Sequence, residues 1–352
     1  MRTTADRINF FRALEEEPFR FDFFQAMRRI ECLHADLPRL GTAMRPGDEP
    51  LRLGQEPAMD FAPAAISALH PGKEGRPPRV EVRFLGLFGP NGPLPLHLTD
   101  YARERIKHGG DATFARFADM FHHRALMLFY RAWAQAQPTV SLDRPKDDRF
   151  AGFVGSLIGV GSERLHGRDD VPDHAKLYYS GLLVRQIRNA DGLQALLTGY
   201  FRLAIRVEQF VPHWMRLRMV ERTRVGDRGA SAQLGVGAVL GGRVWDRQHK
   251  FRLWIGPLSL PQYESFLPGG KAIKGLMALV RQYLCFELEW DAGLVLRGSE
   301  VPRTHLGRYG RLGWTTWLGS RRMERDADDL RLDPERIFAE APGEFDAAMP
   351  AT

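Results

Sequence analysis

The adjacent histidines His122 and His123 are the residues in this sequence best suited by type to acid–base or metal chemistry. They lie in a stretch with helical spacing, where consecutive side chains point about 100° apart. A helix presents two histidines to one metal ion when they are four residues apart, so we interpret this pair as packing and hydrogen-bonding residues. The two cysteines, Cys32 and Cys285, lie far apart and form no C-x-x-C spacing, which predicts neither a disulfide framework nor a cysteine-rich metal site.

Short glycine and serine motifs also lack the spacing of a dinucleotide-binding or nucleophile site. In GVGAVLGG (Gly235–Gly242) the third glycine of a dinucleotide fingerprint is replaced by Leu240, and no strand-to-helix transition surrounds the motif. The segment GFVGSLIG lacks the spacing of a nucleophile elbow, so Ser156 is interpreted as an ordinary serine. The aspartate pairs Asp147–Asp148 and Asp169–Asp170 lie in polar loop sequence, where a solvated turn is commoner than a catalytic pair. We therefore expect no catalytic, cofactor-binding or metal-binding residues, and predict that the protein is not an enzyme.

Composition indicates a folded protein that can bury a core. The 352 residues are 44% hydrophobic and carry a net charge of +7, and only seven of the 50 basic residues are lysines. Arginine is common at interfaces, but here it is spread along the chain rather than gathered into a stripe with aromatics. Nucleic-acid binding is therefore kept only as the alternative function. No apolar run approaches the roughly 20 residues of a membrane span, and the N-terminus lacks a signal-peptide core, so we expect a cytoplasmic protein.

The order of the predicted elements favours an α+β fold. We expect amphipathic helices over residues 4–34, interrupted at Pro18, with Phe11 on the first stripe and Phe23, Met27 and Ile30 on the second. Both stripes need a covering surface. Further helices are expected over 111–133, 174–200 and 273–284, and strands over 80–84, 201–211, 251–255 and 286–296. This mixed order lacks a regular β-α-β rhythm. The predicted division is 1–37, 38–200, 201–321 and 322–352.

The most regular predicted helix, over residues 111–133, is apolar on more than one side. Phe114, Phe117, Phe121 and Leu128 follow helical spacing along one face. The opposite face carries Tyr130 rather than only charge. This pattern indicates burial most of the way round, inside a domain or an assembly.

The C-terminal segment 322–352 is predicted to be a disordered acidic tail. From Glu324 onward it contains nine acidic residues and only three arginines. A segment with this charge and few apolar residues gains little from packing.

Two loops that each follow a predicted strand share the pattern Gly-Pro-Leu-x-Leu. The first loop is 84–102 and the second is 255–270. Proline stiffens each segment and the two leucines of each pattern stand on the same side of an extended chain. The leucines are covered either by their own domain or by a partner. The candidate partner-binding residues in the two loops are Pro93, Leu94, Pro95, Leu96, Leu98, Pro257, Leu258 and Leu260.

Several long segments resemble, in order and spacing, the TssG family of type VI secretion baseplate subunits, also called ImpH or VasB. The resemblance covers residues 10–321 and leaves out the acidic tail. The matching segments are RFLGLFGPNGPLPLHLTDYARER, FADMFHHRALMLFYRAW, FVGSLIGVG, VWDRQHKFRLWIGPLSLPQYESFLPGG and LGWTTWLGSRR.

The resemblance implies a structural subunit without catalytic activity or cofactor, located in the cytoplasm at the inner face of the cell envelope. It implies that the chain joins TssF chains in a baseplate wedge, to which the N-terminal helices (1–37) would contribute. It also implies that the two apolar loops each hold a copy of TssK, and that TssE and other baseplate components are neighbours. Neither nucleic acid nor membrane insertion is implied.

Overall fold

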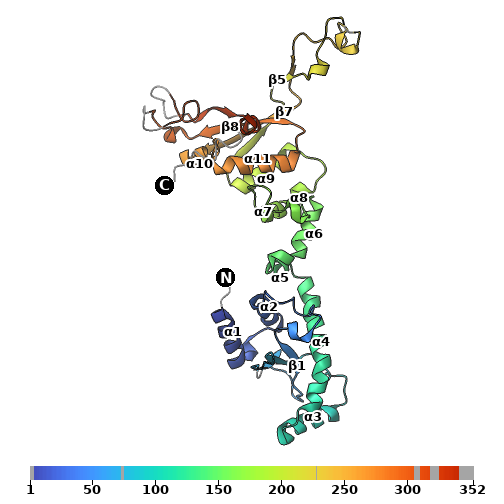
Figure 1. The fold of residues 1–352 in the computed structure, drawn as a ribbon. Coiled ribbons are helices and arrows are strands. Elements are labelled where there is room, and N and C mark those ends of the chain that lie inside the picture. The colour runs from blue at the N-terminus through green and yellow to red at the C-terminus, as the bar shows by residue number, and fades with distance from the viewer. Residues whose placement is uncertain (1–3, 73–74, 227, 305–309, 318–324, 341–352) are drawn as a thin grey trace. The chain divides into compact units, whose positions relative to one another are not determined.

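The structure is a computed structural model that describes residues 4–72, 75–226, 228–304, 310–317 and 325–340. It divides into two compact units, Met1–Gly152 (unit 1) and Phe153–Thr352 (unit 2), shown in Figure 1. The division falls inside helix α6 (Arg149–Leu157), whereas the sequence placed a division after residue 200. Mixed helices and small sheets confirm the α+β prediction. Within the described ranges, no helix is both long and apolar enough to cross a bilayer.

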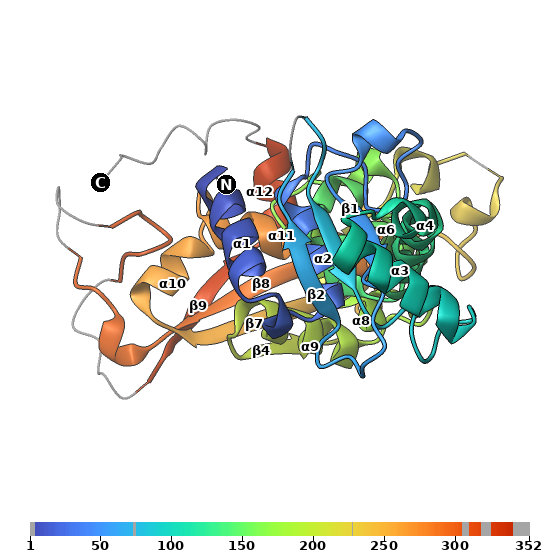
Figure 2. The same cartoon turned by 90° about the horizontal axis from the view of Figure 1, so that it is seen from below.

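Unit 1 is a three-stranded sheet between helices. Its strands have the order β1-β3-β2, with β1 parallel and β2 antiparallel to β3. Helix α4 packs against β1 at one edge and α1 against β2 at the other (Figure 2). The elements are α1 (Thr4–Glu16), α2 (Phe23–Leu33), β1 (Arg52–Gln55), β2 (Ile66–His70), β3 (Arg79–Val82), α3 (Leu96–Gly109), α4 (Thr113–Gln135) and α5 (Pro138–Leu142).

Two arginines fasten the long connections of unit 1 to its helices. The Arg144 guanidinium donates to the backbone carbonyls of Leu37 (2.7 Å), His34 (3.0 Å) and Glu31 (2.6 Å). Arg39 contacts the buried carboxylate of Glu31 at 3.2 Å. A guanidinium offers five donors in a fixed fork, so a single arginine satisfies several carbonyls that irregular chain leaves unpaired.

Unit 2 contains a four-stranded sheet of order β4-β7-β8-β9, in which β7 and β8 are parallel and both edge strands are antiparallel. Figure 1 shows α9 and α11 on one side of this sheet. A separate two-stranded ribbon joins β5 to β6. The elements are α7 (Asp173–Tyr178), α8 (Ser180–Leu183), α9 (Ala190–Phe201), β4 (Ile205–Glu208), β5 (His213–Arg216), β6 (Arg243–Asp246), β7 (Lys250–Leu258), α10 (Leu260–Ser265), α11 (Lys271–Leu284), β8 (Glu289–Leu296), β9 (Ala327–Leu332) and α12 (Pro334–Glu340).

The two faces of β7 differ as strand alternation requires. Leu253 and Ile255 are fully buried in the core with the helices. Arg252 points to the other face, where its guanidinium binds the carboxylate of Asp291 on β8 at 2.5 Å. Burial alone would raise the pKa of Asp291, but hydrogen bonds from Arg252 and Lys250 outweigh it and hold that pKa below its usual value.

The acidic C-terminal segment is ordered over the part that the structure describes, which corrects the predicted start of the tail at 322. Ala327 and Leu332 of β9 belong to the core of unit 2, and β9 pairs with β8. The strand forms despite its high charge because its two apolar ends are buried while Asp328 and Asp329 are exposed to solvent. The remainder of the predicted tail, 341–352, lies outside the described residues.

Candidate partner-binding surfaces

The first apolar loop, 84–102, is fastened at its base by buried side chains. The Leu87 N–H donates to His122 Nε2 at 2.9 Å. The Gln55 side chain exchanges two hydrogen bonds with the backbone of Phe88, each 2.8 Å long. Thr99 Oγ1 accepts from the Gly89 N–H at 3.1 Å. The loop is therefore a preformed structure, because its buried backbone groups have fixed partners.

Helix α4 satisfies the free edge of β1 with its own polar side chains. Leu53 and Gln55 direct their N–H groups away from β3, toward His123 Nδ1 (3.1 Å) and Asp119 Oδ1 (3.0 Å). Because His122 Nε2 accepts a backbone N–H, its Nδ1 carries the proton and donates to Asp119 at 3.2 Å. The interpretation of both histidines as hydrogen-bonding residues is confirmed, and α4 holds a sheet edge and the loop base at once.

Asp111 lies just before α4, whose N-cap is Ala112 without a side-chain cap. Its Oδ1 accepts from the Thr113 N–H at 3.0 Å, and Arg105 contacts its Oδ2 at 2.5 Å. Hydrogen bonds from Thr113, followed by that from Arg105, lower the pKa of Asp111 to about 2. The carboxylate is therefore charged throughout the neutral range, next to the positive end of the helix.

Within loop 84–102 the leucines differ in exposure. Leu94 packs against a small cluster around Phe88 and is half-buried. Leu96 is 50% exposed and begins α3 rather than continuing an extended segment, and Leu98 lies half-buried in the same first turn. Pro93 and Pro95 are exposed. The available surface consists of the two prolines and Leu96.

The second loop is mostly internal, which corrects its interpretation as a partner-binding finger. Strand β7 continues through Leu258, whose side chain is 0% exposed and which pairs with Leu296 of β8. Leu260 is partly buried against the same core, and its N–H donates to Glu300 at 2.6 Å. Of the three candidate residues in this loop, only Pro257 is exposed. The sheet of unit 2 itself covers Leu258, so this leucine is not a free anchor.

The N-terminal helices are likewise part of their own unit. Phe23, Met27 and Ile30 are at most 1% exposed and belong to the main core of unit 1, and Phe11 packs against it. The expectation that Phe23, Met27 and Ile30 face a partner is therefore corrected, because the core of unit 1 covers the stripe of α2. The prediction was wrong because the strands that bury this stripe lie far away in the sequence and could be recognised there only in part. Phe11 is half-buried, and its assignment to a partner contact stays a prediction.

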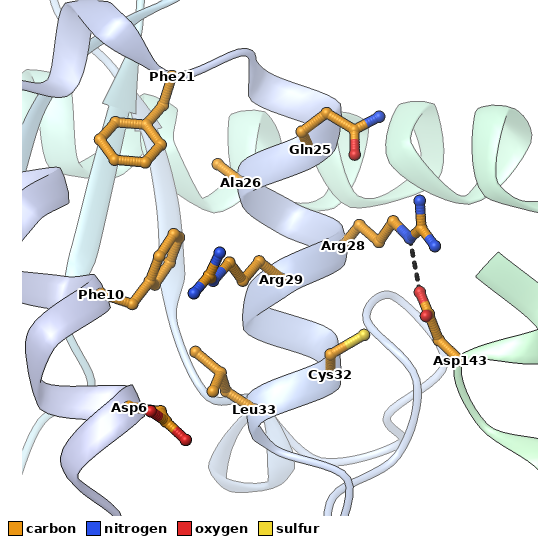
Figure 3. A pocket seen from close by; sticks show the side chains of 10 residues that line it. All are labelled: Asp6, Phe10, Phe21, Gln25, Ala26, Arg28, Arg29, Cys32, Leu33 and Asp143. Atoms are coloured by element: carbon orange, nitrogen blue, oxygen red, sulfur yellow. Dashed lines mark hydrogen bonds and ion pairs between the residues drawn. The ribbon is translucent and has the colours of Figure 1, made fainter. Parts of the chain in front are cut away.

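A groove of about 620 Å³ remains between α1 and α2, and Figure 3 shows its lining. The Arg29 guanidinium lies 5.2 Å from the centre of the Phe10 ring. Arg28 donates to Asp143 at 2.5 Å on the far side. Aromatic and aliphatic side chains beside guanidinium groups suit the side chains of another protein. Within the ranges that the structure describes, no three His, Cys, Asp or Glu residues come together as metal ligands would.

Helix α4 carries a row of exposed apolar side chains on one face. Phe117, Met120, Phe121 and Leu128 are 57%, 62%, 58% and 49% exposed, and the rings of Phe117 and Phe121 lie 5.6 Å apart. The sequence correctly predicted a helix that is apolar on more than one side, but unit 1 itself buries only one of these sides and leaves the side with Phe117, Phe121 and Leu128 exposed.

The opposite face of α4 fills the core for a simple steric reason. It carries small residues, Ala115 and Ala118, in the cluster around Phe88 of the loop, and Met127 and Tyr130 in the main core of unit 1. Close approach to the loop requires small side chains at the contact. A row of phenylalanines could not have fitted there.

Known proteins share sequence and fold with this chain. The sequence model of the family described as Type VI secretion, TssG, matches residues 17–319. A chain of a structure described as the baseplate complex from the type VI secretion system is 20% identical, with a TM-score of 0.63 and 94% of each chain covered. A chain of the TssK-TssF-TssG baseplate subcomplex is 21% identical, with a TM-score of 0.50, 61% of this chain and 90% of that chain covered. No curated protein sequence matches the chain. Since the family model spans most of its length, this chain belongs to the TssG family of type VI secretion proteins.

Proposed function

We propose that the chain is a structural subunit of a type VI secretion baseplate wedge, working in the cytoplasm at the inner face of the cell envelope. In this proposal the exposed face of α4 joins a TssF-type subunit, and loop 84–102 docks a TssK-type subunit. The similar solved subcomplex contains TssK, TssF and TssG together, which supports the choice of partners.

The observation that carries the proposal is the apolar face of α4. Four large side chains, about half exposed, occupy one side of a 23-residue helix. An exposed apolar patch of this kind usually marks a protein contact. Phe117, Phe121 and Leu128 recur at intervals of four and seven residues, the spacing with which a helix meets another helix. A TssF-type helix laid along this face would cover all three.

The proposal for TssK rests on the rigidity of loop 84–102. Pro93, Pro95 and Leu96 are held outward by a base that His122, Gln55 and Thr99 fasten. A preformed apolar loop loses little conformational entropy on binding, which favours affinity. The second loop is left out of this function, because Leu258 is internal.

Co-expression with the TssF and TssK proteins of the same secretion system tests both contacts. The double variant Phe117→Asp/Leu128→Asp should lose TssF, because carboxylates would be placed in an apolar contact. Its matched control, Met44→Asp/Phe61→Asp, changes two equally apolar and more exposed side chains of unit 1, at 99% and 89%, and should retain TssF.

The loop has its own variant in the same experiment. Leu96→Asp should keep TssF and lose TssK. Recovery of TssF by the α4 variant at the level of the control would contradict the assignment of α4, and TssK bound normally to Leu96→Asp would contradict that of the loop.

A further inference from the structure

The ribbon of unit 2 presents one face built from two matched pairs. In the β5–β6 register Trp214 is opposite Trp245, and Arg216 is opposite Arg243. Side chains two residues apart on a strand share a face, so all four point the same way. All four are exposed, the tryptophans by 59% and 54%, and the indole rings lie 5.2 Å apart. The face is therefore an aromatic pair beside a pair of cations.

The two arginines of this face are uncompensated. Like charges directly opposite each other destabilise a strand pair. Among the residues that the structure describes, neither Arg216 nor Arg243 forms an ion pair, whereas the nearby Arg218 binds Glu221 at 2.6 Å. The chain thus neutralises one arginine of this region and leaves the facing pair open, which points to an anionic group supplied from outside.

A third guanidinium, that of Arg222, lies close to this face of the ribbon. Arg222 donates to the Leu217 carbonyl at 3.2 Å and packs over Gly242, where a Cβ atom would lie 3.1 Å from the guanidinium carbon. The three arginines line a hollow of about 670 Å³ together with Trp214 and Leu240. Guanidinium groups bind carboxylates through paired N–H donors, so a cluster of three can hold more than one carboxylate.

The tip of the ribbon adds aliphatic surface. Six side chains there are at least 66% exposed, and none of them belongs to the core of unit 2. They are Met219, Val220, Val225, Leu234, Val236 and Leu240. Proteins bind nucleic acids through cationic side chains and stacking aromatic rings, and aliphatic side chains supply neither interaction. Apolar residues beside arginine and tryptophan are instead the composition of a protein interface.

We propose that this face binds an acidic segment of a partner protein, with its carboxylates between Arg216, Arg222 and Arg243. An apolar side chain of that segment would rest on the paired tryptophans and on the tip. An isolated two-stranded ribbon is marginally stable in water, so binding also completes its packing. The inference rests on the proposed function in one respect, that the chain works inside a protein assembly.

The test uses the full-length chain in cells that express the whole secretion system. A photoreactive benzoylphenylalanine replaces Leu240, and mass spectrometry identifies the crosslinked peptide. We expect a segment of another protein that contains at least two Asp or Glu residues and an apolar residue. In Arg216→Glu/Arg243→Glu its yield should fall at least tenfold. The matched control Arg164→Glu/Arg185→Glu makes the same charge change elsewhere in unit 2 and should leave the yield unchanged.

Charge exchange gives the decisive confirmation. Replacing the acids of the crosslinked segment with lysine should restore the crosslink to Arg216→Glu/Arg243→Glu. A crosslink to nucleic acid, to a second copy of this chain, or to a segment without acids would overturn the proposal, as would equal yields in the two charge variants. Recovery of TssF from the same cells tests the proposed function separately. If TssF binds normally but the ribbon contacts no partner, only this inference is refuted.

Discussion

Single polar side chains on α4 decide the conformation of unit 1 at points far apart in the sequence. Asp119 accepts the Gln55 N–H of the sheet edge and also orients His122. His122 in turn accepts the Leu87 N–H at the base of the docking loop. Both residues are at most 8% exposed. A buried backbone N–H that loses its acceptor costs about 1–3 kcal/mol, so each contact matters to the local fold.

Replacing His122 with phenylalanine should loosen the loop without unfolding unit 1. The Leu87 N–H would lose its acceptor, which costs about 1–3 kcal/mol of local stability. That loss corresponds to roughly 5- to 150-fold faster local opening of the loop. Hydrogen-exchange mass spectrometry over residues 84–92 measures this. His108→Phe, at an exposed position of α3, is the matched control and should leave exchange unchanged. Equal exchange in the two variants would show that His122 does not fasten the loop.

At the scale of elements, the repeated Gly-Pro-Leu-x-Leu pattern is a junction that leads into a helix. The second leucine begins α3 at Leu96 and α10 at Leu260. The first leucine faces inward, half-buried at Leu94 and fully buried at Leu258. The two copies differ because strand β7 continues to Leu258, whereas β3 ends at Val82, well before Leu94.

The two copies should therefore respond differently to the same substitution. Leu258→Asp places a carboxylate in the core of unit 2, which costs several kcal/mol and should leave unit 2 unfolded. Leu96→Asp changes a half-exposed position and should shift stability by less than about 1 kcal/mol. Limited proteolysis of unit 2 and urea denaturation compare the two variants. A folded Leu258→Asp protein that has lost a partner would restore the second loop as a docking site.

The acidic strand β9 is an element whose few apolar residues carry its stability. Ala327 and Leu332 are buried, while Asp328 and Asp329 are exposed on the edge strand. Charges at an edge discourage pairing with another chain. The strand thus closes the core of unit 2 and also protects its border.

Truncating Leu332 should therefore destabilise unit 2 as a core substitution does. We expect Leu332→Ala to lower the free energy of unfolding by about 2–5 kcal/mol. The neighbouring Arg331→Ala, at an exposed position, should change it by no more than about 0.5 kcal/mol. Urea denaturation followed by tryptophan fluorescence measures both. A neutral Leu332→Ala would mean that the acidic segment is not part of the folded core.

At the scale of the whole molecule, each unit has its own core and also exposes apolar surface that it does not cover. In unit 1 this surface is the face of α4, and in unit 2 it is the tip of the ribbon. Most soluble monomers avoid such patches. Several arginines, in contrast, are engaged within their own unit, such as Arg83 with Glu56 at 2.9 Å. This distribution suits a subunit that other proteins surround.

The chain expressed without partners should consequently self-associate. Exposed apolar surface drives association, and partners that bind the folded state stabilise it. Changing Phe117, Phe121 and Leu128 together to serine should raise the monomer fraction in sedimentation velocity. The triple change Met44→Ser/Phe61→Ser/Leu142→Ser, at exposed positions of the same unit, is the control. A monodisperse wild-type chain at high concentration would contradict this prediction.

Local information in the sequence determined the α+β class, the split of the N-terminal helices at Pro18, the long helix α4, and strands β7 and β8. Helical and strand periodicities are properties of neighbouring residues, so they can be recognised without the fold. The family could also be recognised, because long segments keep their order and spacing. Only the tertiary structure decided which of two apolar faces of α4 turns inward, that Leu258 is covered by β8, and that an acidic segment supplies β9. Each of these three outcomes depends on contact with a distant part of the chain. The side chains involved are equally apolar or charged with and without that contact, so their types alone could not predict it.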